Sequence, residues 1–165
     1  MELSPWYLLY CKRSEQERAE QHLQRQGVTC YYPKVLIEKT LRGKKQAKLE
    51  PLFPNYIFIQ FQPETISFTT IRSTRGVANF VRIGIEPCVV PNELVEMLKS
   101  NERGQADEAS QFSPGEAVTI LQGPYAGAEA IYKESDGELR AILFIKMLNQ
   151  QVELSAEKSN ISKKA

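Results

Sequence analysis

Short blocks of apolar residues recur through the first hundred positions, and their spacing predicts strands that alternate with helices. The run at residues 6–11 is apolar throughout, which is typical of a central strand that is buried on both faces. β-branched and aromatic residues at 56–61 and 77–83 predict two further strands. Another is expected over 29–37, broken at Pro33 because proline cannot donate to a sheet.

Helices are expected between these strands. The first begins at Ser14, which forms a capping box with Glu17, and it ends at Gly27. A short helix is expected over 63–73, and a longer one opens at Pro91. This order of elements suggests an α+β sandwich over residues 1–100, in which helices cover a sheet.

The approach to the strand at 56–61 is extended, since Pro51 and Pro54 prevent a helix there. Phe53 lies between the two prolines and outside the strand. From the residues alone it either caps the core or belongs to an exposed contact surface, and both interpretations stay open.

The C-terminal part is harder to assign. Polar residues at 101–113 predict a linker, after which a second apolar region spans 114–156. Tight-turn signals, above all Asp136-Gly137, favour a small five-stranded barrel. Residues 139–148 also have helical spacing and good helix formers, so periodicity does not decide between the two structures. Such a segment is a candidate for two folds of similar free energy.

Composition indicates an ordinary soluble domain, with 42% hydrophobic and 25% charged residues. No apolar run approaches the length of a membrane span, and the N-terminus lacks the basic region of a secretion signal. The cysteines, Cys11, Cys30 and Cys88, are odd in number and are not at metal spacing. We therefore expect reduced thiols in a cytoplasmic protein.

Positive charge is concentrated near the N-terminus. Residues 1–100 hold 14 Lys and Arg against 10 Asp and Glu, and residues 101–165 hold 7 against 10. Within 11–48 the numbers are 10 and 4, and residues 35–50 are expected to form a basic hairpin around the turn at 42–45. The first half can therefore attract a polyanion, and the two halves can attract each other.

Little in the sequence indicates a catalytic site. Cys11 and His22 could form a thiol–imidazole pair, but the spacing suggests no third group. No phosphate-binding loop, dinucleotide fingerprint or zinc spacing is present. We expect no enzyme, no cofactor and no metal.

Basic residues offer the better candidate site, and they admit two interpretations. They are either a solvated charged surface or contacts to nucleic-acid phosphates, with Arg75 or His22 reading base edges. The set comprises Lys12, Arg13, Arg18, His22, Arg25, Arg42, Lys44, Lys45, Arg72 and Arg75.

Several of these segments together resemble the NusG-type transcription elongation factors, over nearly the whole chain. The resemblance rests on Trp6-Tyr7, Leu52-Phe53-Pro54-Asn55-Tyr56, Thr74-Arg75-Gly76-Val77 with Phe80, and Pro114-Gly115-Glu116 followed by Gly123-Pro124-Tyr125-Ala126-Gly127. It implies an N-terminal NusG domain at 1–100, a linker at 101–113 and a KOW module at 114–165.

Other features are similar to the RfaH-type, operon-specific branch of that family. They are Tyr10-Cys11-Lys12-Arg13, the Arg42-Gly43-Lys44 turn, the helix-prone Leu139–Leu148, and a last strand that departs from the general pattern at 149–155. This branch implies a KOW module that is an α-helical hairpin when docked and a five-stranded barrel when free.

The resemblance implies that the N-terminal domain binds RNA polymerase and suppresses pausing. One contact is with the clamp helices of the largest subunit, and a second reaches the gate loop of the other large subunit. Where the family carries His-Thr-Thr-Thr, this chain has Ser67-Phe68-Thr69-Thr70, so only the two threonines carry over. The matching residues are Tyr10, Phe53, Pro54, Val95 and Leu98 for the clamp helices and Thr69 and Thr70 for the gate loop.

It also implies recruitment by an exposed hairpin in the non-template DNA strand at a pause site. The residues that match this DNA-binding surface are Lys12, Arg13, Arg18, His22, Arg42, Thr74 and Arg75.

In the docked form the resemblance implies an interdomain ion pair between Glu50 and Arg140. An isolated surface pair contributes at most about 1 kcal/mol. Apolar contacts, at about 1.5–3 kcal/mol per large side chain, are therefore expected to dominate. They would come from Tyr132, Leu143, Phe144 and Met147 against Phe53, Val95 and Leu98. After release the barrel recruits the ribosome through a small-subunit protein. The chain itself is expected to be a monomer and not to bind a membrane.

We therefore expect a non-enzymatic, operon-specific antitermination factor that couples transcription to translation. The alternatives are a general NusG-type factor without autoinhibition, a ribosome-associated RNA-binding KOW protein, and, last, an enzyme that uses Cys11.

Overall fold

The computed structural model describes residues 4–107 and 128–149. Expectations for the remaining segments, including the KOW motif at 114–127 and the strand at 149–155 beyond its first residue, lie outside the described residues. None of the described helices is both long and apolar enough to cross a bilayer.

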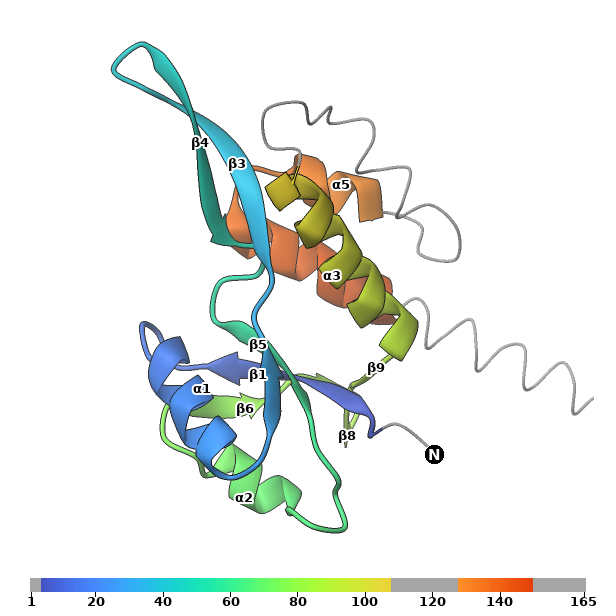
Figure 1. Ribbon diagram of the computed structural model, residues 1–165. Helices are drawn as coiled ribbons and strands as arrows, with labels where there is room; N and C mark the ends of the chain where they lie inside the picture. Colours follow the sequence, from blue (N-terminus) through green and yellow to red (C-terminus); the bar gives the residue numbers. More distant parts are fainter. Residues whose placement is uncertain (1–3, 108–127, 150–165) are drawn as a thin grey trace, which may run out of the picture.

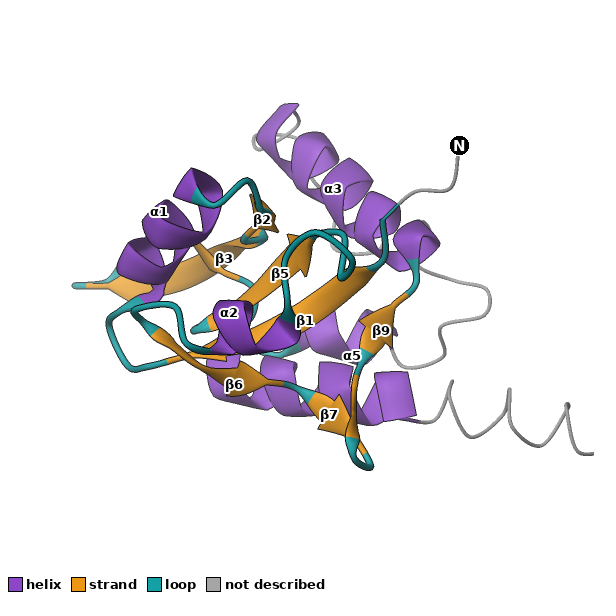
Figure 2. Cartoon of the chain, turned by 90° about the horizontal axis from the view of Figure 1, so that it is seen from below, coloured by secondary structure: helices purple, strands orange, loops and turns teal. Residues whose placement is uncertain are grey.

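An antiparallel sheet forms the centre of the fold, in the order β2-β5-β1-β6 (Figure 2). β1 (Trp6–Cys11) pairs with β5 (Tyr56–Gln60), so that Leu8 lies opposite Phe58. β2 (Thr29–Tyr31) and β6 (Val77–Phe80) flank this pair, and β9 (Val89–Val90) pairs with the start of β1. The central position predicted for residues 6–11 is confirmed.

Helices cover both faces of this sheet, which explains why β1 is apolar throughout (Figure 1). α1 (Gln16–Arg25) and α2 (Phe68–Arg72) pack with Tyr7 and Leu9 in one core. α3 (Asn92–Asp107) packs on the other face with Trp6 and Leu8. Successive residues of a strand point to opposite faces, so both sets of side chains are buried.

Two helix predictions need correction at their N-termini. α1 begins at Gln16 after Glu15, without a side-chain cap, because Ser14 adopts a left-handed conformation with φ of 64°. α2 covers only 68–72, where 63–73 was predicted. Its start is set by Ser67, whose Oγ accepts from the Thr70 backbone N–H at 3.1 Å.

A long hairpin projects from the sheet and is formed by β3 (Lys34–Leu41) and β4 (Lys44–Pro51). Arg42 and Gly43, with φ of 53° and 78°, make the two-residue turn, as hairpins with the right-handed twist require. The predicted basic hairpin and the break at Pro33 are both confirmed. The strand predicted over 77–83 is instead split, because β6 ends at Phe80 and a small hairpin of β7 (Arg82–Ile83) and β8 (Glu86–Pro87) follows.

α3 continues to Asp107, so residues 101–107 are helical where a linker was predicted. Polarity was a poor guide here, because Glu, Arg and Gln are good helix formers. Asn101 also continues the buried side of α3 at helical spacing from Leu94 and Leu98, and only 2% of it is exposed. The remaining linker residues, 108–113, lie outside the described part.

We call residues 128–149 the tail. They form α5 (Ala128–Lys133) and a second helix over 137–149. Asp136, which together with Gly137 is a hairpin signal in the sequence, is in this fold the N-cap of that helix. Its Oδ1 accepts from the backbone N–H of Glu138 at 2.9 Å, and its carbonyl oxygen accepts from the Arg140 N–H at 3.0 Å.

Candidate functional site

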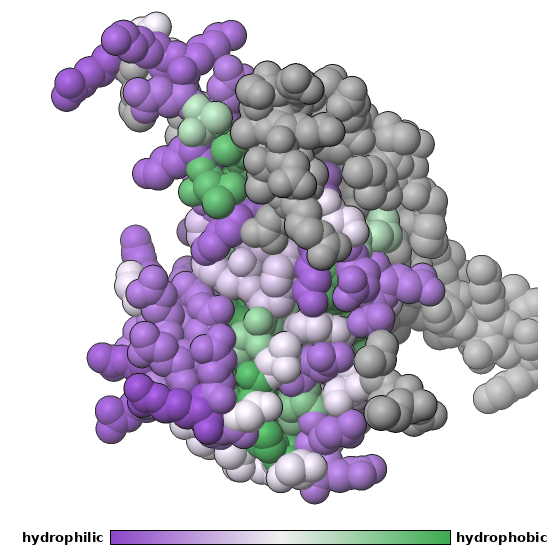
Figure 3. Space-filling view, in the orientation of Figure 1, coloured by the Kyte–Doolittle hydropathy of each residue, from purple (hydrophilic) through white to green (hydrophobic). Residues whose placement is uncertain are grey.

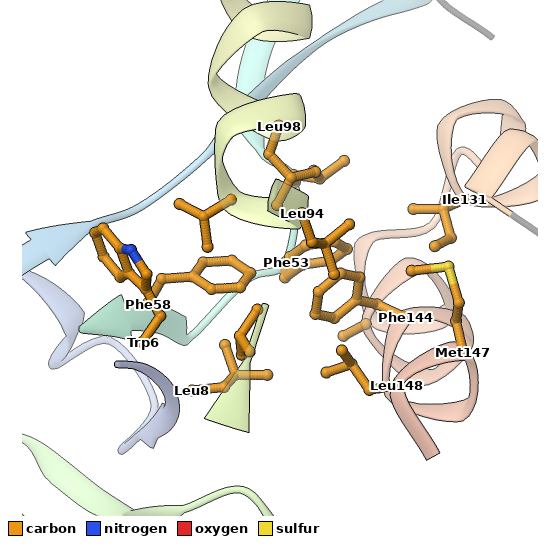
Figure 4. Close-up of a cluster of buried hydrophobic side chains, with 14 of the residues drawn as sticks. Trp6, Leu8, Phe53, Phe58, Leu94, Leu98, Ile131, Phe144, Met147 and Leu148 are labelled. Carbon is orange, nitrogen blue, oxygen red and sulfur yellow. The ribbon is translucent and has the colours of Figure 1, made fainter. Parts of the chain in front are cut away.

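Phe53 is the centre of the contact between the tail and the sheet. Its ring centroid lies 4.5 Å from that of Phe144, and Phe144 in turn meets Phe58 edge-on at 5.6 Å (Figure 4). Only 1% of Phe53 is exposed. Phe53 is thus a core residue, but part of what buries it comes from the other end of the chain.

α3 supplies the second side of this contact. Val95 and Leu98 are buried in the same cluster, to which the tail contributes Phe144 and Met147. Tyr132 and Leu143 pack against the cluster and are only partly buried. Each large side chain that this cluster removes from water contributes about 1.5–3 kcal/mol to the stability of the contact.

The remaining residues matched to the clamp-helix contact lie at the rim. Pro54 is half-buried beside the start of the helix at 137–149. Tyr10 is 41% exposed and its ring packs on Tyr56, with centroids 5.0 Å apart. Of the matched residues, Phe53, Val95 and Leu98 therefore share a buried cluster with the tail, and Phe53 contacts Phe144 directly, whereas Tyr10 keeps 41% of its surface exposed.

Arg140 crosses from the tail to the end of β4, and its side chain is fully buried. Its Nη2 lies 2.9 Å from Glu50 Oε1 and also donates to the Pro51 carbonyl at 3.1 Å. Its Nε donates to the Leu52 carbonyl at 2.8 Å, and its Nη1 donates to the Glu134 carbonyl at 2.8 Å. One guanidinium thus holds the N-terminal domain at three acceptors and the loop of its own tail at a fourth.

This geometry corrects the sequence-based treatment of the ion pair as an isolated surface pair. The side chains of Arg140 and Glu50 are 0% and 19% exposed. Removing one partner of a buried pair leaves an uncompensated charge and costs roughly 3–5 kcal/mol. Sequence reasoning missed the carbonyl acceptors because a backbone oxygen has no residue signature.

The residues matched to the gate loop lie elsewhere in the molecule. Thr69 and Thr70 are exposed on α2, which packs in the core of the opposite sheet face. Thr70 is held by Ser67, since their hydroxyl oxygens are 2.8 Å apart.

Most residues matched to DNA binding gather around α1. Lys12, Arg13, Arg18 and Arg75 are exposed and His22 is partly exposed. Figure 3 shows hydrophilic side chains over α1 and again at the tip of the β3–β4 hairpin, where Arg42 lies. The fold therefore brings the first group together and leaves Arg42 apart from it.

A tight turn after α2 joins this group. The backbone N–H of Lys12 donates to the Gly76 carbonyl at 2.8 Å. A Cβ at Gly76 would lie 2.7 Å from the Glu15 carbonyl oxygen, so only glycine fits there, and its φ of 90° favours glycine as well. Gly76 thus holds Arg75 next to the start of α1.

Thr74 differs from the other matched residues because it is 93% buried, with 7% exposed. Its hydroxyl donates to the Thr70 carbonyl at 2.9 Å and accepts from Gln26 Nε2 at 3.1 Å. Both hydrogen-bonding roles are occupied inside the protein, so Thr74 is placed to position the turn rather than to bind a base. Gln26, at the end of α1, was missed because nothing in the sequence indicates its partner.

Cys11 has no features of a nucleophile. Its side chain is buried, and burial, helped by the negative charges of Glu20 and Cys30, raises the pKa of its thiol to about 12. The reactive thiolate is therefore not formed at neutral pH. Among residues 4–107 and 128–149 there is also no group of three or more side chains arranged to hold a metal.

Comparison with known proteins places the chain in a family. A family model described as "Transcription termination factor nusG" matches residues 4–99. Similar proteins carry the name transcription termination/antitermination protein NusG. That of Rickettsia conorii is 23% identical over 145 residues, covering 81% of this chain and 76% of the relative. That of Thermus thermophilus is 27% identical over 141 residues, covering 73% and 77%.

That of Helicobacter pylori strain 26695 is 27% identical over 109 residues, covering 65% of this chain and 62% of the relative. The solved structure described as "Domain interaction in Thermotoga maritima NusG" has 22% identity and a TM-score of 0.36, and the match covers 58% of this chain and 55% of that one. The family match alone spans more than half of the 165 residues. The chain therefore belongs to the NusG family of transcription termination and antitermination factors.

Proposed function

We propose that the chain is an operon-specific antitermination factor of the RfaH type, kept from RNA polymerase by its own tail. The observation that carries the proposal is the burial of Phe53, Val95 and Leu98 in one cluster with the tail residues Phe144 and Met147, in which Phe144 packs on Phe53. An apolar surface that also has to bind a partner must be uncovered first. The tail is then an autoinhibitory segment, and its domain, 114–165, is separate in function from the domain at 1–100.

In the free form, the patch of Tyr10, Phe53, Pro54, Val95 and Leu98 binds the clamp helices of the polymerase. Thr69 and Thr70 contact the gate loop from the other end of the N-terminal domain. The separation of these sites on opposite sheet faces supports a bridge between two polymerase subunits. Such a bridge would oppose opening of the cleft and so suppress pausing.

Recruitment depends on the basic residues around α1. Lys12, Arg13 and Arg18 contact phosphates of the exposed non-template strand, and Arg75 and His22 read base edges. None of these side chains lies under the tail, so DNA recognition can precede release. That order lets a specific DNA sequence select where the factor acts.

The released C-terminal domain, 114–165, then forms the five-stranded barrel and recruits the ribosome through a small-subunit protein. Two exposed apolar residues support an alternative fold for this segment. Leu139 and Ile142 are 46% and 48% exposed on the solvent side of their helix. Apolar side chains on the outer side of a helix stay in water and add little to its stability, whereas a barrel could bury the same side chains. We place this activity in the cytoplasm.

The helices at 128–133 and 137–149 favour this proposal over a general NusG-type factor, which would keep a barrel in the free protein. The basic surface does not distinguish the proposal from a ribosome-associated KOW protein. A pull-down with purified polymerase separates those two.

The test is Arg140→Ala in the full chain, with binding to purified RNA polymerase as the measurement. Loss of the buried guanidinium should free the patch and tighten binding by about tenfold or more, since breaking a buried pair costs roughly 3–5 kcal/mol. Lys146→Ala, at an exposed position of the same helix, is the matched control and should bind like the wild type. Equal binding by all three proteins would overturn the proposal.

A further inference from the structure

Gly137 is the first residue of the helix at 137–149, immediately after its cap, Asp136. It is not among the glycines with positive φ, which are Gly27, Gly43, Gly76 and Gly84. Any L-residue could therefore adopt its backbone conformation in this fold. The reason for a glycine must lie in what surrounds it.

Pro54 leaves no space for a side chain at this position. A Cβ built on Gly137 would lie 2.6 Å from Pro54 Cγ and 2.8 Å from Pro54 Cδ. It would also lie 3.3 Å from Nη2 of Arg140, the atom that binds Glu50. Real Cβ atoms do not approach ring carbons so closely, so either the proline or the helix would have to move.

Pro54 cannot move easily, because both of its neighbours are anchored. Phe53 is 1% exposed, and its carbonyl accepts from the Tyr56 N–H at 3.0 Å. Asn55 donates its N–H to the Tyr32 hydroxyl at 3.1 Å and accepts from the Cys11 N–H at 2.7 Å. The ring of Pro54 also fixes its own backbone φ. The helix is therefore the part that would shift.

We infer that Gly137 is a specificity-determining residue of the contact between the tail and the N-terminal domain. The surface at Pro54 accepts the start of a helix only where that helix has no Cβ. This close approach brings Arg140, one turn further along, within reach of Glu50 and of the carbonyls of Pro51 and Leu52. A methyl group at 137 would lift the helix and lengthen those bonds together.

The inference deepens the proposed function and rests on it in one respect, namely that the tail must later leave. In a barrel, the same glycine would occupy a tight turn after Asp136, where a left-handed conformation is required. Gly137 would then serve both folds for different reasons. A measurement of docking alone isolates the role described here.

The experiment follows the Arg140 Nε–H in the full chain by NMR. That proton is buried and donates to the Leu52 carbonyl, so in the docked form it exchanges slowly with solvent. Gly137→Ala should reduce its protection by about tenfold or more, the scale expected when a well-packed contact is overfilled. Glu138→Ala, the exposed neighbour, should leave the protection as in the wild type.

Pro54→Ala provides the decisive second variant, because it removes the two ring atoms that the new methyl group would meet. In the double variant, Gly137→Ala should lower protection by no more than about threefold relative to Pro54→Ala alone, a non-additivity expected only of residues in contact. Unchanged protection in Gly137→Ala would overturn the inference, and so would an equal loss with and without the ring.

Polymerase binding by Gly137→Ala then tests the proposed function separately. If protection falls and binding rises, both hold. If protection falls and binding does not rise, the steric role of Gly137 stands and autoinhibition fails.

Discussion

The two faces of the central sheet are covered by different parts of the chain. One face lies under helices of the N-terminal part, and the other lies partly under the tail. On one face, α1 and α2 close a core whose described members all come from residues 7–80. On the other face, Leu8 and Phe58 lie under α3 and under the tail. The first cover cannot leave without unfolding the domain. The second includes a separate segment, which we expect to leave as a unit if another apolar surface replaces it.

The largest expected effect comes from truncating one large side chain on each face. Phe144→Ala should weaken the tail contact by about 3–5 kcal/mol, because it removes a buried ring and leaves a cavity over Phe53. Hydrogen exchange should then speed up at tail amides while those of β1 and β5 keep their protection. Leu23→Ala, on the α1 face, is the comparison variant and should speed exchange throughout the sheet.

If Phe144→Ala exposed β1 and β5 as much as Leu23→Ala does, the tail would be an integral part of the domain. The distinction between the two faces would then be wrong, and no independent release of the tail could occur.

A smaller effect is expected at the ion pair. Glu50→Ser should weaken docking by about 3 kcal/mol, the lower end of the range for removing one partner of a buried pair. Arg140 keeps the carbonyls of Pro51, Leu52 and Glu134, so the loss should be smaller than for Arg140→Ala. Far-UV circular dichroism of the full chain should show more β-structure in Glu50→Ser than in the wild type. Spectra that coincide would count against release of the tail by this change.

Much of the N-terminal fold could be predicted from sequence, because its patterns have a single interpretation. The continuous apolarity of residues 6–11 predicts a central strand, and the turn expected at 42–45 predicts a basic hairpin; both are present, with the turn confined to Arg42-Gly43. In contrast, residues 139–148 fit strand and helix equally well, since nearly every position is apolar or a good helix former. Only a tertiary contact, such as that of Phe144 with Phe53, decides between them.

The candidate site was predictable where side chains act and not where the backbone does. Arg140 and Glu50 could be matched by residue type, but the carbonyls of Pro51 and Leu52 could not. Gly137 was assigned to a β-turn because sequence cannot show that Pro54 lies against it. Chemistry contributed by carbonyls and by missing Cβ atoms becomes visible only in the fold.

The buried thiols provide a pH-dependent comparison of native and variant chains. Burial raises the pKa of Cys11 from 9.0 to about 12, so the folded state keeps a proton that the unfolded state loses above pH 9. The contribution of Cys11 to stability is therefore complete below pH 9 and is lost as pH rises towards 12. Through this group, the free energy of unfolding falls by at most about 1.4 kcal/mol per pH unit.

Denaturant unfolding of the wild type and of Cys11→Ala between pH 8 and about 10.5 checks this sign. The wild type should lose stability more steeply than the variant above pH 9, whatever the difference at neutral pH. Parallel curves would mean that the thiol ionises freely, and Cys11 would again be a candidate nucleophile.

The smallest expected effect concerns the basic surface around α1, which the tail does not cover. It tests whether Thr74 positions the DNA-binding turn or contacts DNA itself. Thr74→Val keeps the shape of the side chain and removes both hydrogen bonds of its hydroxyl, so it should cost about 1 kcal/mol of folding stability. It should also weaken binding to polymerase stalled at the cognate pause site, because Arg75 is no longer held against α1.

Arg75→Ala should weaken that binding more, since a base contact is worth about 1–3 kcal/mol, and it should leave the folding stability unchanged. Binding to polymerase without the DNA element should be unaffected in both variants. If Thr74→Val bound as weakly as Arg75→Ala while unfolding like the wild type, Thr74 would be a direct DNA contact, and its burial under Gln26 would have to be reversed on binding.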